Sequence, residues 1–136
     1  MGQQQLLLII LGVIVVGIAV AVGITMFNDS AVSANRDAVT NDLVNLASRA
    51  QQFYRRPIAL GGGGGSFTNL TSMALLTKTS GASMVNGNGT YTLTTGTNSI
   101  TLTGNGTETG NDGTTPVMVV MLVWADSARV DPAQTN

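Results

Sequence analysis

The fold of this chain is decided by the stretch LLLIILGVIVVGIAVAVGITMF, which runs from Leu6 to Phe27. The stretch carries no charge, and Thr25 is its only strongly polar residue. An apolar run longer than about 18 residues is typical of a membrane-spanning helix. At about 1.5 Å per residue it measures roughly 33 Å as a helix, close to the thickness of the hydrocarbon layer of a bilayer. The sequence therefore predicts a helix that is apolar along its whole length.

No side of this helix is marked by polar residues, so every side requires cover. If each residue hides about 100 Å² of apolar surface, removing the run from water contributes on the order of 50 kcal/mol as an upper bound. Lipid, the chain's own core or matching helices of other copies can supply that cover. The rest of the chain is small and polar and cannot surround a helix. Two hypotheses remain, a simple single-pass anchor in lipid and assembly with other copies.

Small residues recur within the apolar run, at Gly12, Gly17 and Gly23 and at Ala19 and Ala21. Small side chains let helix backbones approach closely, which favours contact between helices over contact with lipid alone. Their spacing is not a clean GxxxG, and glycine is also simply frequent in spanning helices, so both interpretations stay open. No proline interrupts the run, which predicts an unbroken helix.

Helical periodicity continues beyond the apolar run, but with one dry face. The apolar positions recur at spacings of three, four and seven, and they are Val32, Val39, Leu43, Leu46, Ala50 and Phe53. This pattern predicts an amphipathic helix over residues 29–57, continuous with the hydrophobic helix of residues 1–28. Arg55 and Arg56 suit the negative end of a helix dipole, and Pro57 ends the helix. Together the two parts predict one rod, Gln3 to Arg55, about 80 Å long.

Residues 58–81 form a glycine-rich link that contains five consecutive glycines, Gly61 to Gly65. A phosphate-binding loop requires a lysine and a helix start directly after it, and neither follows here. We expect a flexible loop that allows other chains to pass close by. Ser72 is a candidate cap for a short helical turn over 73–76, whose apolar residues pack on the rod.

The remaining residues, 82–136, are typical of strands and turns. Thr90–Thr94 and Ser99–Thr103 alternate polar and apolar residues and are bounded by turn sequences, 86–89 and 95–98. We expect a long polar loop over 104–115, then a strand over 117–124 that is apolar on both faces, and a loosely held tail over 126–136. The side chains predicted to pack between helix and sheet are Val39, Leu43, Leu46, Ala50, Phe53, Tyr91, Leu93, Ile100, Leu102 and Trp124.

Composition narrows the possible functions of the 136 residues. Charged residues make up 10%, the net charge is −1, and Lys78 is the only lysine, which argues against a nucleic-acid partner. The sequence has no cysteine and no histidine, so disulfides, thiolate metal sites and conventional hydrolase triads are excluded. We expect no enzymatic activity, no cofactor and no metal.

The order of these segments resembles that of type IV pilins and the related archaeal pilins and pseudopilins. An uncharged start, an apolar run that continues as an amphipathic helix, a glycine-rich link and a small antiparallel sheet all match, with the sequence signal concentrated in Gln3–Pro57. The resemblance implies an α+β "lollipop" fold with a long N-terminal helix on a C-terminal antiparallel sheet. It also implies a subunit that an assembly machinery extracts from the membrane, so that its hydrophobic helices bundle with those of identical subunits.

The resemblance assigns roles to particular residues. Bacterial type IV pilins usually carry a glutamate at the fifth mature position; if Met1 is the mature start, Gln5 stands there and can form hydrogen bonds but no ion pair. Gln3, Gln4 and Gln5 are thus the candidates for polar contacts at the start of the helix. The candidates for packing in the filament core are Leu6, Leu7, Ile10, Gly12, Val13, Val16, Gly17, Ala19, Val20, Gly23 and Phe27.

None of the first 28 residues is basic, unlike the start of a secretory signal peptide. Either Met1 follows a basic leader that has been removed, or something other than flanking lysine and arginine sets the orientation in the membrane.

Two surface features fit an extracellular location. Asn28, Asn69, Asn88 and Asn105 each begin an Asn-x-Ser/Thr acceptor sequence, although such triplets also arise by chance in a chain rich in Asn and Thr. Outward threonines are candidates for O-linked sugar. A second cluster, Asn105, Glu108, Asn111 and Asp112, offers oxygens to calcium, but a solvated loop fits its low acidic density better.

The function predicted from the sequence is a structural subunit of an extracellular, pilus-like filament that resides in the cytoplasmic membrane before assembly. Two alternatives remain. One is a pseudopilin that forms short rods in a secretion machine, and the other is a membrane-anchored module that binds a glycan or another surface.

Overall fold

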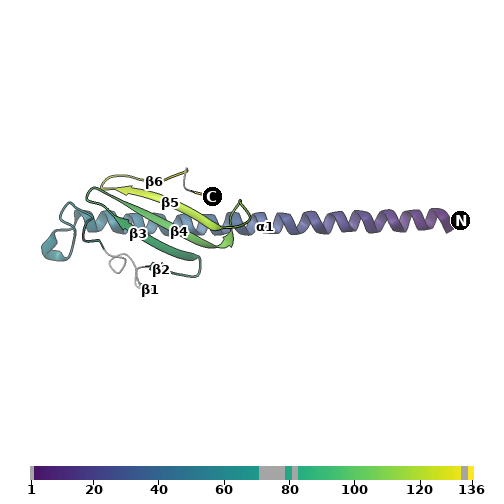
Figure 1. Cartoon of the computed structure of the whole chain (residues 1–136), viewed down its shortest axis with the longest axis horizontal. Coiled ribbons are helices and arrows are strands. Elements are labelled where there is room, and N and C mark those ends of the chain that lie inside the picture. Colours follow the sequence, from purple (N-terminus) through teal and green to yellow (C-terminus); the bar gives the residue numbers. More distant parts are fainter. Residues whose placement is uncertain (1, 71–78, 81–82, 133–134) are drawn as a thin grey trace.

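The computed structural model describes residues 2–70, 79–80, 83–132 and 135–136 and has one long helix beside one sheet (Figure 1). The helix is α1 (Gly2–Arg55), and a short 3-10 helix, η1 (Ile58–Leu60), follows it. The strands are β1 (Thr79–Ser80), β2 (Ser83–Val85), β3 (Gly89–Thr95), β4 (Ser99–Thr109), β5 (Pro116–Trp124) and β6 (Ala128–Val130). The α+β architecture predicted from the sequence is confirmed.

The rod predicted from the hydrophobic and amphipathic patterns is a single helix. α1 runs unbroken through 54 residues, and its first half projects well beyond the sheet (Figure 1). Its end follows from Pro57, which has no backbone N–H and disfavours helical geometry at the residue before it. The amide of Arg56 still donates to the carbonyls of Gln52 and Phe53 at 3.1 and 3.2 Å.

The strands form one antiparallel meander in chain order, from β1 to β6. The longest pairings are those of β3 with β4 and of β4 with β5. Because the strands are joined in sequence by short turns, the sheet needs no crossover, and its inner face lies along the second half of α1 (Figure 1).

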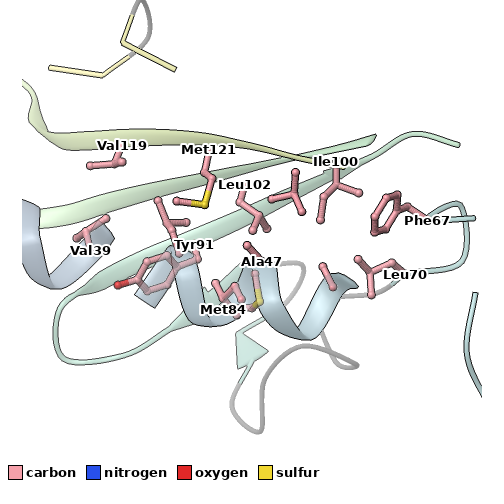
Figure 2. Packing of buried hydrophobic residues seen from close by; sticks show 14 of the residues in the cluster. Val39, Ala47, Phe67, Leu70, Met84, Tyr91, Ile100, Leu102, Val119 and Met121 are labelled. Carbon is pink, nitrogen blue, oxygen red and sulfur yellow. The ribbon is translucent and has the colours of Figure 1, made fainter. Parts of the chain in front are cut away.

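The core lies between the amphipathic half of α1 and the inner face of the sheet (Figure 2). The helix contributes Val39, Leu43, Leu46, Ala47 and Ala50, all of them buried. Alternate residues of the strands meet them, because side chains two apart along a strand share one face. The buried strand residues are Met84, Tyr91, Ile100, Leu102, Val117, Val119, Met121 and Val123, and Phe67 and Leu70 close one end.

The predicted helix–sheet contacts are confirmed for all but one residue. Tyr91, Ile100 and Leu102 are buried in the core, while Phe53 and Leu93 are partly buried and pack against it. Trp124 is the exception. It pairs with Ser99 in the sheet register, so its side chain lies on the opposite face from Val123. There it is half-buried, with the guanidinium of Arg129 5.5 Å from the ring centroid.

Two segments predicted to be irregular contain strand residues. The prediction of a loop over 104–115 is wrong for its first half, because β4 continues to Thr109. Glycine at 104 and 106 lowers strand propensity, which hid this strand from sequence analysis. The tail over 126–136 contains β6, and the side chain of Asn136 accepts a hydrogen bond from the amide of Met118 at 2.7 Å.

The glycine run is also ordered rather than flexible. The amides of Gly63, Gly64 and Gly65 donate to the carbonyls of Phe53, Arg56 and Tyr54 at 2.8 to 2.9 Å. The last carbonyls of a helix lack the amide four residues on that interior carbonyls bond, so the loop caps the C-terminus of α1. Gly64 and Gly65 adopt positive φ angles of 58° and 89°, which glycine tolerates best. The helical turn predicted over 73–76 lies outside the described residues.

Candidate functional site

The candidate site is the first half of α1, which the chain itself leaves uncovered. Every large apolar side chain between Leu6 and Phe27 is more than half exposed, from 51% at Val22 to 80% at Phe27. In the second half of the same helix, Val39 and Leu43 are fully buried. One helix thus combines a half that packs in the chain's own core with a half that requires an apolar environment from outside it.

The polar groups of this half-helix are satisfied locally. Helical hydrogen bonds pair the backbone groups of its interior, and the hydroxyl of Thr25 donates to the carbonyl of Val22 at 2.8 Å. By length and composition the helix is able to cross a membrane. Its surface is therefore equally suited to lipid and to other apolar helices.

The residues that the sequence predicts for the filament core all lie on this half, and they are distributed around the helix. A Cβ atom added at Gly12, Gly17 or Gly23 meets nothing within 4 Å. The fold of the single chain thus gives no packing reason for glycine at these positions. Gln3, Gln4 and Gln5 lie exposed at the start of α1, beside the apolar residues.

Asn35 fixes α1 to the sheet near the point where the exposed half begins. Its side-chain amide donates to the carbonyl of Asn88 at 3.0 Å, and its carbonyl oxygen accepts from the amides of Thr107 and Glu108 at 3.1 and 3.4 Å. A Cβ at Gly106 would lie 1.9 Å from that oxygen, so glycine is needed for the approach. One residue further, Arg36 donates to the main-chain oxygen of Asn136 at 2.5 Å.

Asp42 makes a second polar connection between helix and sheet. Its Oδ2 accepts hydrogen bonds from the side chains of Asn86, Asn88 and Tyr91 at 2.7, 2.8 and 2.6 Å. Burial raises the pKa of Asp42, but the three hydrogen bonds outweigh burial and hold the pKa below its ordinary value of 3.8. The pKa of Tyr91 is raised, first by burial and then by its bond to the carboxylate. These contacts hold α1 firmly on the sheet, so the exposed half has a fixed direction relative to the sheet.

The four acceptor asparagines differ in their surroundings. Asn28 and Asn69 are exposed, and Thr71 of the Asn69 triplet lies outside the described residues. Asn88 and Asn105 are half-buried, and the side-chain nitrogen of Asn88, the atom that would carry a glycan, is bonded to Asp42. Only Asn28 and Asn69 of the four therefore have exposed side chains.

The acidic loop considered for calcium is organised by its own hydrogen bonds. The carboxylate of Asp112 accepts from the Thr115 hydroxyl and from the amides of Thr115 and Thr114, which lowers the pKa of Asp112 to about 2. Among the residues that the structure describes, no three His, Cys, Asp or Glu side chains are grouped as metal ligands.

Comparison with protein-family models, with curated proteins and with solved structures found no match for this chain. The function must therefore be argued from the geometry of the chain itself.

Proposed function

We propose that this protein is a structural subunit of an extracellular, pilus-like filament in which the first halves of α1 from many copies bundle together. Before assembly the same half-helix spans the cytoplasmic membrane. Assembly exchanges lipid contacts around Leu6–Phe27 for contacts with the same segment of neighbouring copies. No ligand, metal or catalytic group takes part.

The observation that carries the proposal is the exposure of the apolar half on every side. A helix that packs against one partner needs only one apolar stripe, as the second half of α1 illustrates. A helix that is apolar all round fits lipid or the centre of a multi-helix bundle. Glycine at 12, 17 and 23, where the single chain gives no packing reason for it, favours close approach of other helices.

The rigid connection between rod and sheet also supports assembly. Asn35, Arg36 and Asp42 hold the helix on the sheet domain through hydrogen bonds to three side chains and four main-chain groups. A fixed angle between rod and head is required for identical copies to repeat one contact in a helical array. A tethered binding module has no such requirement, because a mobile link serves it equally well.

The proposal is tested by placing a charge in the middle of the apolar half. Val16→Asp and Ala19→Asp are each expected to abolish fibres in sheared cell-surface material viewed by negative-stain microscopy. An aspartate costs about 3 kcal/mol at the centre of a spanning helix, and more where no water or partner reaches it. The matched control is Thr94→Asp, which places the same charge on an exposed position of β3.

Membrane insertion of each variant is measured by fractionation, because a charge also disfavours insertion. Ala19→Leu provides a variant that stays apolar and inserts normally, yet enlarges a position expected to lie between helices; it is expected to reduce fibre yield. Fibres at normal yield in the aspartate variants would contradict the proposal. Parent protein found only as detergent-soluble monomers would favour the membrane-anchored module.

A further inference from the structure

A cleft lies where the exposed half of α1 meets the sheet domain. Its volume is about 490 Å³, and it is lined by Asn28, Asp29 and Val32 of α1 and by Glu108, Thr109 and Asn111 of β4 and the turn after it. We call it the neck cleft. Asp29 and Glu108 give it negative charge, Asp112 follows in the same turn, and Phe27 beside it is 80% exposed. Arg36, the arginine nearest to Asp29 in the sequence, donates a hydrogen bond to the main-chain oxygen of Asn136.

The opposite end of the domain has the opposite character. Residues 55–60, called the tip, carry two exposed arginines, Arg55 and Arg56, and two apolar side chains, Ile58 and Leu60, that are each 71% exposed. Arg49 lies beside Arg56, and Arg129 and Asp126 lie together near Ala125, which Arg55 contacts. Arg55 contacts the carbonyl of Ala125 at 3.3 Å, an exposed bond that leaves its charge at the surface.

We propose that the tip of one copy docks in the neck cleft of a second copy. The inference rests on the proposed filament and names the contact that repeats between its heads. Arg55 and Arg56 face Asp29 and Glu108, while Ile58 and Leu60 cover Phe27 and Val32. The two surfaces are complementary in charge and in apolar area. The tip and the neck cleft lie at opposite ends of the sheet domain along α1, so a copy displaced along the rod brings one against the other (Figure 1).

The geometry of the rod excludes this contact within one chain and permits it between two. Asp29 and Arg56 are separated by about 40 Å along α1, at about 1.5 Å per residue. A second copy displaced by that distance brings the two ends together. Because tip and cleft are different surfaces, the contact is heterologous, and its repetition gives an open array instead of a closed dimer.

The same displacement has a consequence for the apolar half. Residues 2–28 are also about 40 Å long as a helix, so the apolar half of the second copy, whose neck cleft is occupied, runs alongside residues 29–55 of the first. The side of that segment away from the sheet presents Ala31, Ala34, Val44 and Ser48, all exposed, with Val44 at 50%, and the exposed polar side chains of Asp37 and Asn41 lie on the same side. Small residues there allow a neighbouring helix to approach. Head docking therefore joins copies displaced by about 40 Å, while the apolar halves meet side by side only between copies displaced by less.

Charge reversal with rescue tests the contact in the full chain. The tip variant Arg55→Glu/Arg56→Glu makes both ends negative, and the neck variant Asp29→Arg/Glu108→Arg makes both ends positive. Each is expected to lower the yield of sheared fibres by about tenfold or more, because like charges meet across the contact. The chain that carries all four substitutions restores opposite charges and is expected to return to within about threefold of the parent.

The single substitutions Arg56→Glu and Glu108→Arg provide a milder pair in case a double variant is unstable. Thermal unfolding of each variant shows whether its sheet domain is folded. Thr92→Lys is the matched control, since it adds a charge at an exposed position of β3, away from both the tip and the neck cleft. Folded single-end variants that assemble like the parent would overturn the contact and leave the filament proposal standing. So would a four-substitution chain that is folded but remains unassembled. A parent chain that forms no fibres at all would overturn both.

Discussion

At the scale of single residues, Asp42 connects two parts of the fold that are far apart in sequence. Its partners, Asn86, Asn88 and Tyr91, lie 44 to 49 residues away in the chain. Each is a short charge-assisted bond, and such bonds contribute more than neutral ones. The carboxylate is only half-buried, so solvent weakens the contribution of each bond.

Asp42→Asn is expected to lower the free energy of unfolding by about 1 to 2 kcal/mol at neutral pH. A group whose folded pKa is depressed stabilises the protein above its unfolded pKa and loses that effect as pH falls through the folded pKa. The difference between parent and variant should therefore be constant from pH 7 to about pH 5 and shrink below pH 4. Denaturant unfolding of the full chain in detergent at several pH values measures this difference. A difference that does not change with pH would contradict the account.

Gly104 is a residue at which the sheet approaches the apolar side of α1 closely. A Cβ there would lie 2.5 Å from Cγ1 of Val39 and 3.1 Å from the ring of Tyr91. Gly104→Ala is expected to cost about 1 to 3 kcal/mol, because the core has no space for the added methyl group. Gly87→Ala is the control, since a Cβ at Gly87 meets nothing within 4 Å. Equal thermal unfolding midpoints for the two variants would count against this packing.

Sequence analysis found the apolar contacts at this scale but missed the polar ones. Val39, Leu43, Tyr91 and Leu102 follow periods of 3.6 and 2, and these periods are visible in the sequence. Asn35 and Asp42 are two of many exposed-looking polar residues on a helix, and only the folded sheet brings their partners to them. Trp124 was placed on the wrong face because a strand that is apolar on both sides gives no alternation to fix its register.

At the scale of elements, the boundaries of α1 could be predicted because Pro57 follows an uninterrupted helical pattern. The glycine run after it could not. Five glycines in a row are typical of a flexible linker, and nothing in their order reveals that the amides of Gly63, Gly64 and Gly65 bond back to the helix. The strand predicted over Ser99–Thr103 ends too early for a related reason. Gly104 and Gly106 lie where Val39 and Asn35 of the helix approach the strand closely, and they do not mark a loop.

The small residues in the first half of α1 give a prediction for the element as a whole. Gly17→Leu leaves the fold of the single chain unchanged, because a Cβ at Gly17 meets nothing within 4 Å. If neighbouring helices approach there, the larger side chain is expected to reduce fibre yield by about tenfold, equivalent to about 1.4 kcal/mol per contact. Val16→Leu is the control, since it adds volume at a position that is already large. Equal fibre yield for both variants would indicate that glycine at 17 has no packing role.

At the scale of the whole molecule, the chain divides its apolar surface between two uses. The second half of α1 and the sheet bury theirs within one copy, and the first half exposes its surface completely. The free energy gained by hydrophobic burial is proportional to the apolar area removed from water. The exposed half therefore determines which environment, water, lipid or other copies, is favourable for the molecule. The sequence indicated this division directly. It left open whether lipid or other copies provide the final cover.

The most direct test of the central claim is to identify what touches the apolar half in assembled material. A photo-cross-linking amino acid replaces Val16, and sheared fibres and membranes are irradiated separately. The account predicts covalent ladders of this chain from the fibres, with the cross-linked site mapped to Leu6–Phe27 of another copy, and mainly lipid adducts from the membrane fraction. Lipid adducts alone in both fractions, with the protein monomeric, would contradict it.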